Sequence, residues 1–541
     1  ATAVERRRSW TSGLARSFVR TCKKRKRGSK IADSTGNELS GGGLLTRSLI
    51  LRRLLLRDVL ADDEAFVGLL VPPSVAGVVA NMACTLARRV PVNLNYTVTS
   101  EVINECIRQA GIKHVITSRA FMEKVKLEVA AELVFLEDFR SKARFRDKLS
   151  CSLAAYGVPA AWLERSLGLH RVTGDDLATV IFTSGSTGTP KGVMLTETNI
   201  GSNVQAIEEI IRLNRSDVLV GVLPFFHSFG YTVCLWVVMC LDVKGVYHFN
   251  PLEAKQVGRL VKKHAGTVIV VTPTFLRTYL RRCDVDEFAT LDAIVAGAEK
   301  LPRELCDAFE AKFGVRPVEG YGTTELSPVV SANIPPSRSP SGTVGNLKEG
   351  TVGRPAPGVS AKITDLDTGK EVGTGRPGML WIKGPNVMKG YLGHDEVTAE
   401  VIRDGWYMTG DIAIIDEDGF LQITGRQSRF SKIGGEMVPH LKIEEALARI
   451  IGGDEEEGFR VVVTAVTDER KGERIVVLHT AISKTPEELR RGLSELGFPN
   501  LFIPSEDSFY QVDEIPVLGT GKLDLRQIKQ LALFVFGQPS G

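Results

Sequence analysis

Residues 182–192 read FTSGSTGTPKG and constrain the chain more than any other stretch. The preceding run, 177–182, is apolar and β-branched, which predicts a buried strand. Glycines let backbone N–H groups approach phosphate oxygens, hydroxyls add donors, and Lys191 adds positive charge. The stretch is not a Walker A loop, because Lys191 follows a proline and precedes a glycine. We therefore predict a phosphate-binding loop outside the P-loop NTPases, the alternative being a surface loop rich in turn formers.

Composition describes a globular protein, since 43% of the 541 residues are hydrophobic and 24% are charged. The length exceeds one ordinary domain. A net charge of +4 is too small to indicate nucleic-acid binding. Basic residues crowd positions 6–8 and 23–27, which predicts either a solvated face or attraction to anionic lipid or an acidic partner. We expect residues 1–45 to be weakly ordered in part.

The cysteines predict a reducing compartment. The eight of them are scattered without a C-x-x-C pair, which fits reduced thiols better than a disulfide framework or a zinc site. We therefore expect a cytoplasmic protein, which could also associate with a membrane. No apolar segment follows the basic start, so we expect no signal peptide. The apolar stretch 67–84 contains two prolines and fits a strand followed by a buried helix better than a membrane span.

The order of apolar patterns predicts an α/β fold. Residues 66–117 alternate between strand and helix patterns, which favours parallel α/β layers. From about 342, glycine and proline rise and short strands alternate in polarity, which indicates an antiparallel sheet or small barrel. Near residue 425 a final α+β segment begins. Further elements are expected as a helix at 199–212, strands at 218–223, 266–271, 291–295, 460–466 and 474–481, and helices at 442–450 and 485–496.

The stretch 182–192 closely resembles the phosphate-loop signature of the adenylate-forming (AMP-binding) superfamily, which includes acyl-CoA synthetases, peptide-synthetase adenylation domains and firefly luciferase. The resemblance implies an adenylation domain at 1–424 with a small β subdomain at about 342–424, a hinge at 425–428, and a mobile C-terminal lid at 429–541. The other motifs follow in the family's order: PFFHSFG at 224–230, AGAEKL at 296–301, EGYGTTE at 319–325, YMTGD at 407–411, GRQSRFSKIGGE at 425–436 and PVLGTGK at 516–522.

The resemblance assigns roles to residues at these motifs. His227 would position the acid carboxylate, Thr324 would contact phosphate and Glu325 would hold Mg²⁺. Lys522 would be the catalytic lysine, neutralising charge on the transferring phosphoryl group. The residues expected to bind ATP are Thr183, Ser184, Gly185, Ser186, Thr187, Gly188, Lys191, Gly297, Ala298, Glu299, Tyr321, Gly322, Thr323, Asp411 and Arg426.

Two of the motifs depart from the common pattern. Glu299 and Lys300 replace the small pair usual in acyl-CoA ligases and look more like the bacterial acyl-acyl carrier protein (ACP) synthetase and 2-acylglycerophosphoethanolamine acyltransferase branch. Ser428 stands where the family usually has Asp or Lys at the hinge. That branch often carries a fused acyltransferase, and such a domain would be missing if Ala1 is a cut site.

The resemblance implies an enzyme that joins a carboxylic acid to ATP, with Mg²⁺, and then passes the acyl group to a phosphopantetheine thiol of ACP or CoA. A medium- to long-chain fatty acid is favoured because the apolar run 225–239 could line an acyl tunnel, although plain core packing would explain it equally well. An amino-acid module is disfavoured by the same apolar run, and an aryl acid stays open. A non-catalytic AMP-binding scaffold is opposed by the intact Lys522, Glu325 and Asp411.

Overall fold

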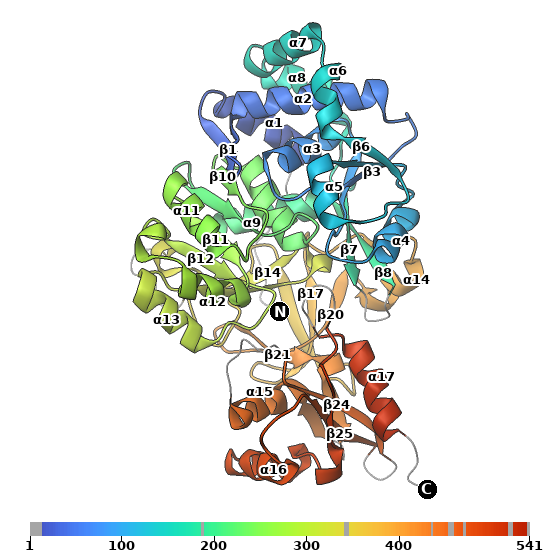
Figure 1. Cartoon of the computed structure of the whole chain (residues 1–541), viewed down its shortest axis with the longest axis vertical. Coiled ribbons are helices and arrows are strands. Elements are labelled where there is room, and N and C mark those ends of the chain that lie inside the picture. The colour runs from blue at the N-terminus through green and yellow to red at the C-terminus, as the bar shows by residue number, and fades with distance from the viewer. Residues whose placement is uncertain are drawn as a thin grey trace.

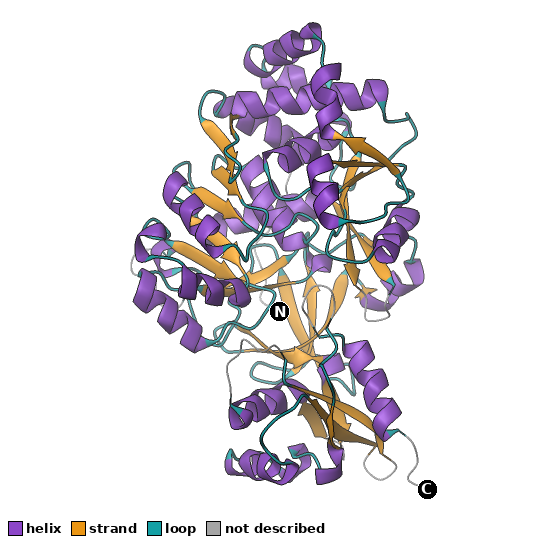
Figure 2. Ribbon diagram, viewed as in Figure 1, coloured by secondary structure: helices purple, strands orange, loops and turns teal. Residues whose placement is uncertain are grey.

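The structure is a computed structural model of the chain, and it describes residues 13–184, 189–339, 346–433, 436–452, 459–468, 472–517 and 523–537. Figure 1 shows an elongated molecule in which the C-terminal elements form the lower end and the N-terminal layers of helices and sheets form the upper part. The colouring by secondary structure shows helices on the outside and strands inside both parts (Figure 2).

Among the described residues, the largest sheet has nine strands in the order β15-β14-β13-β12-β11-β9-β10-β1-β2. Neighbours from β13 to β1 are parallel, while at the edges β2 pairs antiparallel with β1, β14 with β13, and β15 with β14. Strands buried on both faces of a sheet need continuous apolar runs. Strands β9, β11 and β12 form at such runs and confirm the strands predicted at 218–223, 266–271 and 291–295. The strands are β1 Ser29–Asp33, β2 Glu38–Ser40, β9 Val218–Gly221, β10 Lys244–Tyr247, β11 Val268–Val271, β12 Ala293–Ala296, β13 Val318–Gly322, β14 Val329–Ala332 and β15 Arg354–Pro355.

One face of this sheet is covered by α11 Ala254–His264, α12 Pro273–Arg282 and α13 Arg303–Phe313, whose apolar side chains share a core with the strands. The other face packs against α9 Glu197–Ile211 and the buried helical segment η3 Gly230–Val237, which continues into α10 Val238–Cys240. Tyr231 and Trp236 of η3 have no exposed surface. The apolar run that could line an acyl tunnel is therefore core in this structure.

A parallel sheet in the order β4-β3-β5-β6 confirms the predicted strand–helix alternation at 66–117. Its elements are β3 Phe66–Leu69, α3 Val75–Leu86, β4 Val90–Asn93, α4 Ser100–Ala110, β5 His114–Thr117, α5 Arg119–Val125 and β6 Glu132–Phe135. The irregular region that follows contains α6 Phe139–Lys142, α7 Phe145–Tyr156 and α8 Ala160–Ser166 at the upper end of Figure 1.

The glycine-rich stretch joins two antiparallel strands, β7 Leu177–Ser184 and β8 Pro190–Thr196. Thr183 pairs with Lys191, and β18 Gly390–Tyr391 adds to the far edge of β8. The buried strand at 177–182 is confirmed, but the sequence did not reveal the second strand before the helix. Gly192 is required there, because a Cβ would lie 2.9 Å from a methyl carbon of Val180.

The sequence predicts weak order in only part of residues 1–45, and residues 13–45 form regular elements. Helix α1, Leu14–Lys24, buries Leu14, Phe18 and Cys22 completely, and α2, Gly41–Asp58, packs against it. The Lys23 ammonium donates to the carbonyl oxygen of Ala154 at 2.9 Å. A basic residue thus supplies a hydrogen bond to a neighbouring helix end, a use that charge counting does not reveal.

The antiparallel sheet expected after residue 342 is confirmed, with strand order β16-β17-β20-β19 and β21 beside β20. The C-terminal segment is the predicted α+β unit, centred on the antiparallel pair β24–β25. The elements are β16 Ser360–Thr364, β17 Gly378–Lys383, α14 Asp395–Val401, β19 Ile402–Arg403, β20 Trp406–Ile415, β21 Leu421–Arg426, β22 Phe430–Ile433, β23 Glu436–Pro439, α15 His440–Ile451, β24 Val461–Asp468, β25 Gly472–His479, α16 Pro486–Glu495, β26 Phe509–Gln511 and α17 Leu525–Phe536.

These elements confirm the predicted fold class: a large layered α/β region with a smaller antiparallel sheet, followed by a small α+β segment. The exact domain and hinge boundaries stay predictions. No helix in the described part of the chain is both long and apolar enough to cross a membrane.

Candidate active site

One group of site residues lies where β13, β20 and β21 approach one another. The Tyr321 hydroxyl at the end of β13 donates to one carboxylate oxygen of Asp411 on β20. Arg426 stands opposite Asp411 on the paired strand β21, with its Nε 3.0 Å from the other carboxylate oxygen. Burial raises the pKa of Asp411, and Arg426 and Tyr321 oppose that rise by stabilising the charged form. A buried carboxylate held at both oxygens keeps further lone pairs for hydroxyl donors.

A second group surrounds Glu325, which follows β13. The Tyr391 hydroxyl donates to a Glu325 carboxylate oxygen at 2.9 Å. The Lys191 ammonium lies 5.3 Å from the centre of the Tyr391 ring, because β8 and β18 are neighbours in one sheet. One tyrosine therefore contacts both a predicted phosphate-binding lysine and the predicted metal-binding carboxylate. Sequence reasoning missed Tyr391, since a lone Gly-Tyr pair carries no signal of its own.

Thr324 joins the predicted phosphate side of the site to the predicted acid side. The Thr324 hydroxyl lies 3.2 Å from the hydroxyl of Ser228, which neighbours His227 in the chain. The motifs at 319–325 and 224–230 are thus in direct contact. The Thr323 hydroxyl oxygen is buried and has no hydrogen-bond partner among the described residues. Buried hydroxyls in native proteins normally have a partner, so Thr323 offers a hydrogen bond to a ligand.

The acid side consists of aromatic rings from three separate segments. The exposed His227 ring lies 4.5 Å from that of Phe226, between ring centres. Tyr96 packs edge-on against Phe226 at 4.7 Å and against Phe121 of α5 at 5.0 Å. The Tyr96 hydroxyl is buried without a hydrogen-bond partner in the part of the chain that the structure describes, and burial raises its pKa. Sequence reasoning did not single out Tyr96, although it follows a strand at the carboxyl edge of a parallel sheet, where ligands commonly bind.

The turn after β12 carries Gly297, Ala298 and Glu299. Ala298 has a φ of 69°, a left-handed conformation that costs a non-glycine residue about 1 kcal/mol and is enriched at functional sites. The Glu299 carboxylate accepts a hydrogen bond from the Thr274 hydroxyl at 2.7 Å, at the start of α12. Glu299, a predicted nucleotide contact with an exposed side chain, is therefore held against the start of α12.

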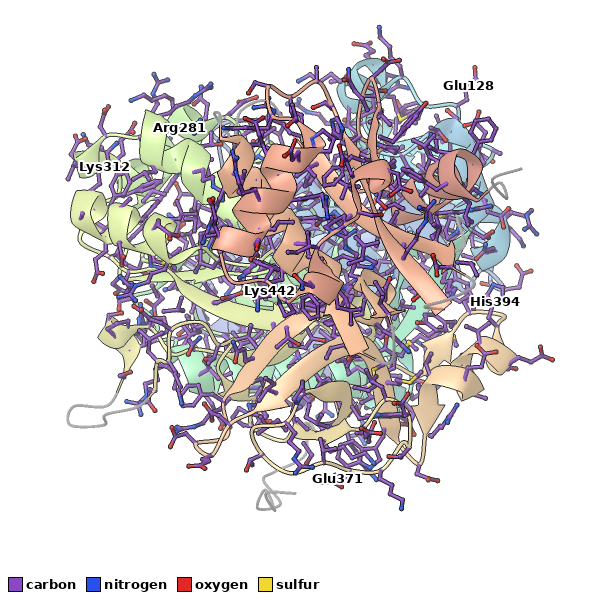
Figure 3. All side chains as sticks on the ribbon, turned by 90° about the horizontal axis from the view of Figure 1, so that it is seen from below. Glu128, Arg281, Lys312, Glu371, His394 and Lys442 are labelled. Carbon is purple, nitrogen blue, oxygen red and sulfur yellow. The ribbon has the colours of Figure 1, made fainter. Side chains whose placement is uncertain are left out.

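The same turn touches the C-terminal segment. The Lys300 ammonium lies 2.8 Å from a Glu445 carboxylate oxygen on α15, and both side chains are largely exposed. Figure 3 looks onto this end of the molecule, with Lys442 of α15 near the centre of the view. Glu319, at the start of the next motif, is half-buried, and its partial removal from water raises its pKa to about 7.

Some predicted site residues are not described. Gly185, Ser186, Thr187, Gly188 and Lys522 lie outside the described residues, and of Ser184 only the backbone is described. Gly322 is exposed and ends β13. The roles predicted for these residues stay predictions.

Comparisons with known proteins show which family has this arrangement of motifs. A family model described as AMP-binding enzyme matches residues 18–392. The chain is 33% identical over 323 residues to a long-chain-fatty-acid–CoA ligase of Bacillus subtilis, covering 58% of this chain and 55% of that protein. It is 30% identical over 362 residues to 4-coumarate–CoA ligase-like 3 of Arabidopsis thaliana, covering 64% of this chain and 62% of that protein. The match thus spans a little more than half the length of these relatives.

A solved structure extends the likeness to nearly the whole fold. ATP-bound MatB from Rhodopseudomonas palustris superposes with a TM-score of 0.77 at 25% identity, covering 96% of this chain and 98% of that one. The family match, the motif order and the clustering around Asp411 and Glu325 agree. The chain belongs to the AMP-binding enzyme family.

Proposed function

We propose that this protein is an ATP-dependent acid–thiol ligase that activates a fatty acid as its adenylate and transfers the acyl group to a phosphopantetheine thiol of CoA or ACP. The observation that carries the proposal is the contact between Ser228 and Thr324. It brings a cluster of aromatic rings that includes His227 against a polar cluster suited to a nucleotide. The names of the relatives support an acid and CoA as substrates.

Polar residues on the nucleotide side would each take one part of ATP. Asp411, held by Tyr321 and Arg426, would accept hydrogen bonds from the ribose hydroxyls, and the Tyr321 ring would lie against adenine. The turn at Gly297–Glu299 would border the base. Phosphate oxygens would accept hydrogen bonds from the hydroxyls of Thr323 and Thr324, from the glycine-rich loop and from Lys191 at the start of β8.

The residues present fit Mg²⁺. This ion binds proteins through one or two carboxylates and completes its shell with water and substrate phosphates. Glu325 supplies such a carboxylate, fixed in place by the Tyr391 hydroxyl. The ion would lower the negative charge of the phosphates when bound. Glu325 would orient it, and Lys191 lies over the ring of the same tyrosine.

The chemistry would proceed in two steps. A carboxylate oxygen of the acid attacks the α-phosphorus, the bond to pyrophosphate breaks, and Lys522 balances the negative charge of the transferring group. The thiol sulfur then attacks the acyl carbon, and AMP leaves with the electron pair of the broken C–O bond. We propose that a C-terminal lid at 429–541 turns about a hinge at 425–428 between the steps, on the adenylation domain at 1–424.

An aryl acid is a second candidate substrate. The rings of Tyr96, Phe121 and Phe226 form an edge-to-face cluster beside His227, and such a cluster could receive another ring. The similarity to a 4-coumarate–CoA ligase-like protein points the same way.

ATP–pyrophosphate exchange over a panel of fatty, aryl and amino acids tests the proposal. We expect exchange to peak with a medium- or long-chain fatty acid, and a peak with an aryl acid would select the second candidate. Exchange should be lost in a Lys522→Ala variant. If protein that still binds ATP showed no exchange with any acid, the proposed enzyme would be rejected in favour of a non-catalytic nucleotide-binding scaffold. Thioester formation with CoA or with ACP then identifies the acceptor.

A further inference from the structure

Helix α7 turns its bulky apolar side chains away from the protein. Its inner face, with Asp147, Cys151 and Ala155, is buried where the helix packs on α2. Residues four apart share a helix face, and Phe145 and Leu153 are 77% and 61% exposed on the opposite side. A helix on the surface of a soluble protein normally shows the reverse arrangement, with polar residues outward.

The exposed apolar surface continues beyond one helix. Leu149 and Tyr156 lie on the same face of α7, and Trp162 of α8, which only three residues separate from the end of α7, is 75% exposed. Figure 1 shows α7 and α8 at the upper end of the long axis, far from the C-terminal elements. We call this surface the apolar ridge, made of Phe145, Leu149, Leu153, Tyr156 and Trp162.

Cations stand at the N-terminal end of the ridge. The segment 140–148 contains one acid, Asp147, and that carboxylate is buried and paired with Arg53 at 3.3 Å and Arg57 at 3.1 Å. The nearby Asp138 is paired with Arg119. The exposed basic residues of the segment are Arg140, Lys142, Arg144, Arg146 and Lys148.

A second group of cations stands at the C-terminal end. The Lys23 ammonium donates to the carbonyl oxygens of Ala155 at 3.1 Å and Val158 at 2.5 Å, so the basic run 23–27 lies beside the end of α7. Lys24, Lys26 and Arg27 are exposed there. The buried Glu164 of α8 is paired with arginines of α1. The acids near the ridge are thus largely neutralised, while the cations on both sides of it face solvent.

We propose that the apolar ridge and its flanking cations dock this protein on an anionic phospholipid surface. Bulky side chains would enter the boundary between headgroups and acyl chains, and the cations would bind lipid phosphates. At 12 residues, α7 is too short to span a bilayer, so it would lie in the interface. A second copy of the chain is the poorer occupant, because it would bring two positively charged rims together.

The proposal goes beyond the ligase function, and its test needs no turnover. The full chain is floated with vesicles of phosphatidylcholine alone, and with vesicles containing an equal amount of phosphatidylglycerol. We expect binding to the anionic vesicles that weakens with salt. The variant Phe145→Ser/Leu153→Ser/Trp162→Ser should lower the bound fraction about tenfold or more. The matched control is Phe534→Ser on α17, because Phe534 is also 77% exposed, and it should bind like the wild type.

A second pair of measurements does not depend on the folding of the triple variant. Arg144→Glu/Lys148→Glu should weaken binding to anionic vesicles, and Trp162→Phe should remove the blue shift of tryptophan emission that we expect on binding. Equal binding to neutral and anionic vesicles, or undiminished binding by the charge variant, would overturn the proposal. So would a wild-type dimer that the triple variant converts to monomer without any lipid binding.

Discussion

The two sides of the candidate site are built from different kinds of interaction. On the nucleotide side, polar side chains of adjoining strands hold one another, as Tyr321 and Arg426 hold Asp411. On the acid side, rings from separate segments pack around Tyr96, whose hydroxyl has no partner among the described residues. Hydrogen-bonded charges are positioned before the ligand arrives, which suits a nucleotide that never varies. Packed aromatic side chains can be replaced by other apolar side chains of similar volume with little loss of stability. Such packing suits a substrate that differs between relatives.

The largest effect should come from the nucleotide side. Glu325→Gln keeps the shape of the side chain and removes its charge, so the rate of ATP–pyrophosphate exchange should fall about 100-fold or more. Glu371→Gln is the matched control, because Glu371 is exposed, bridges to Thr364 of β16 outside the site motifs, and stands at the lower edge of Figure 3. Equal rates in the two variants would show that Glu325 carries no charge-dependent role.

Variants on the acid side and on the nucleotide side should change different KM values. His227→Ala should raise the KM for the acid about tenfold and leave the KM for ATP nearly unchanged, because one hydrogen bond to the carboxylate is lost. Asp411→Asn should do the reverse. Steady-state kinetics with each substrate varied in turn measures both. If both variants raised both KM values equally, the site would not divide as described.

The stability of the turn region should depend on pH through Glu319. Burial raises the pKa of its carboxyl group from 4.5 to about 7, so the folded protein holds a proton that the unfolded chain releases between these values. The free energy of unfolding should therefore fall as pH rises through this window, and this fall should be absent in Glu319→Gln. Urea denaturation of both proteins at about pH 5 and about pH 8 measures the difference. Parallel pH dependences would contradict the assignment.

The smallest effect tests the unpaired hydroxyl on the acid side. Tyr96→Phe should raise the free energy of unfolding by about 1 kcal/mol, because a buried hydroxyl without a partner is removed. If that hydroxyl binds the acid, saturating acid should abolish the gain. Thermal or urea denaturation with and without acid distinguishes the cases, and a destabilised variant without ligand would show that Tyr96 has a partner.

Contiguous motifs made the nucleotide side predictable. Tyr321, Glu325, Asp411 and Arg426 each belong to a short run whose neighbours identify it, and the structure brings Tyr321, Asp411 and Arg426 together. Tyr391 and Tyr96 could not be found this way, because each acts through contacts with residues far away in the chain.

Three further features of the fold could not be predicted from the sequence. The basic run at 23–27 looked like part of a weakly ordered tail, yet Lys23 bonds to the end of α7 and follows apolar residues buried in α1. Helix α7 faces outward with its apolar side chains, which obscures the usual helical pattern in the sequence. Lys191 lies on strand β8, which the sequence did not predict because the strand directly follows the glycine-rich stretch.

Direct detection of the acyl-adenylate tests the central claim. The protein is incubated with ATP, Mg²⁺ and a long-chain fatty acid without any thiol, then quenched and analysed by chromatography and mass spectrometry. The account predicts an enzyme-bound species with the mass of the acyl-AMP, together with pyrophosphate, and neither in Lys522→Ala. Release of ADP and phosphate, or unchanged ATP with every acid that binds, would contradict it.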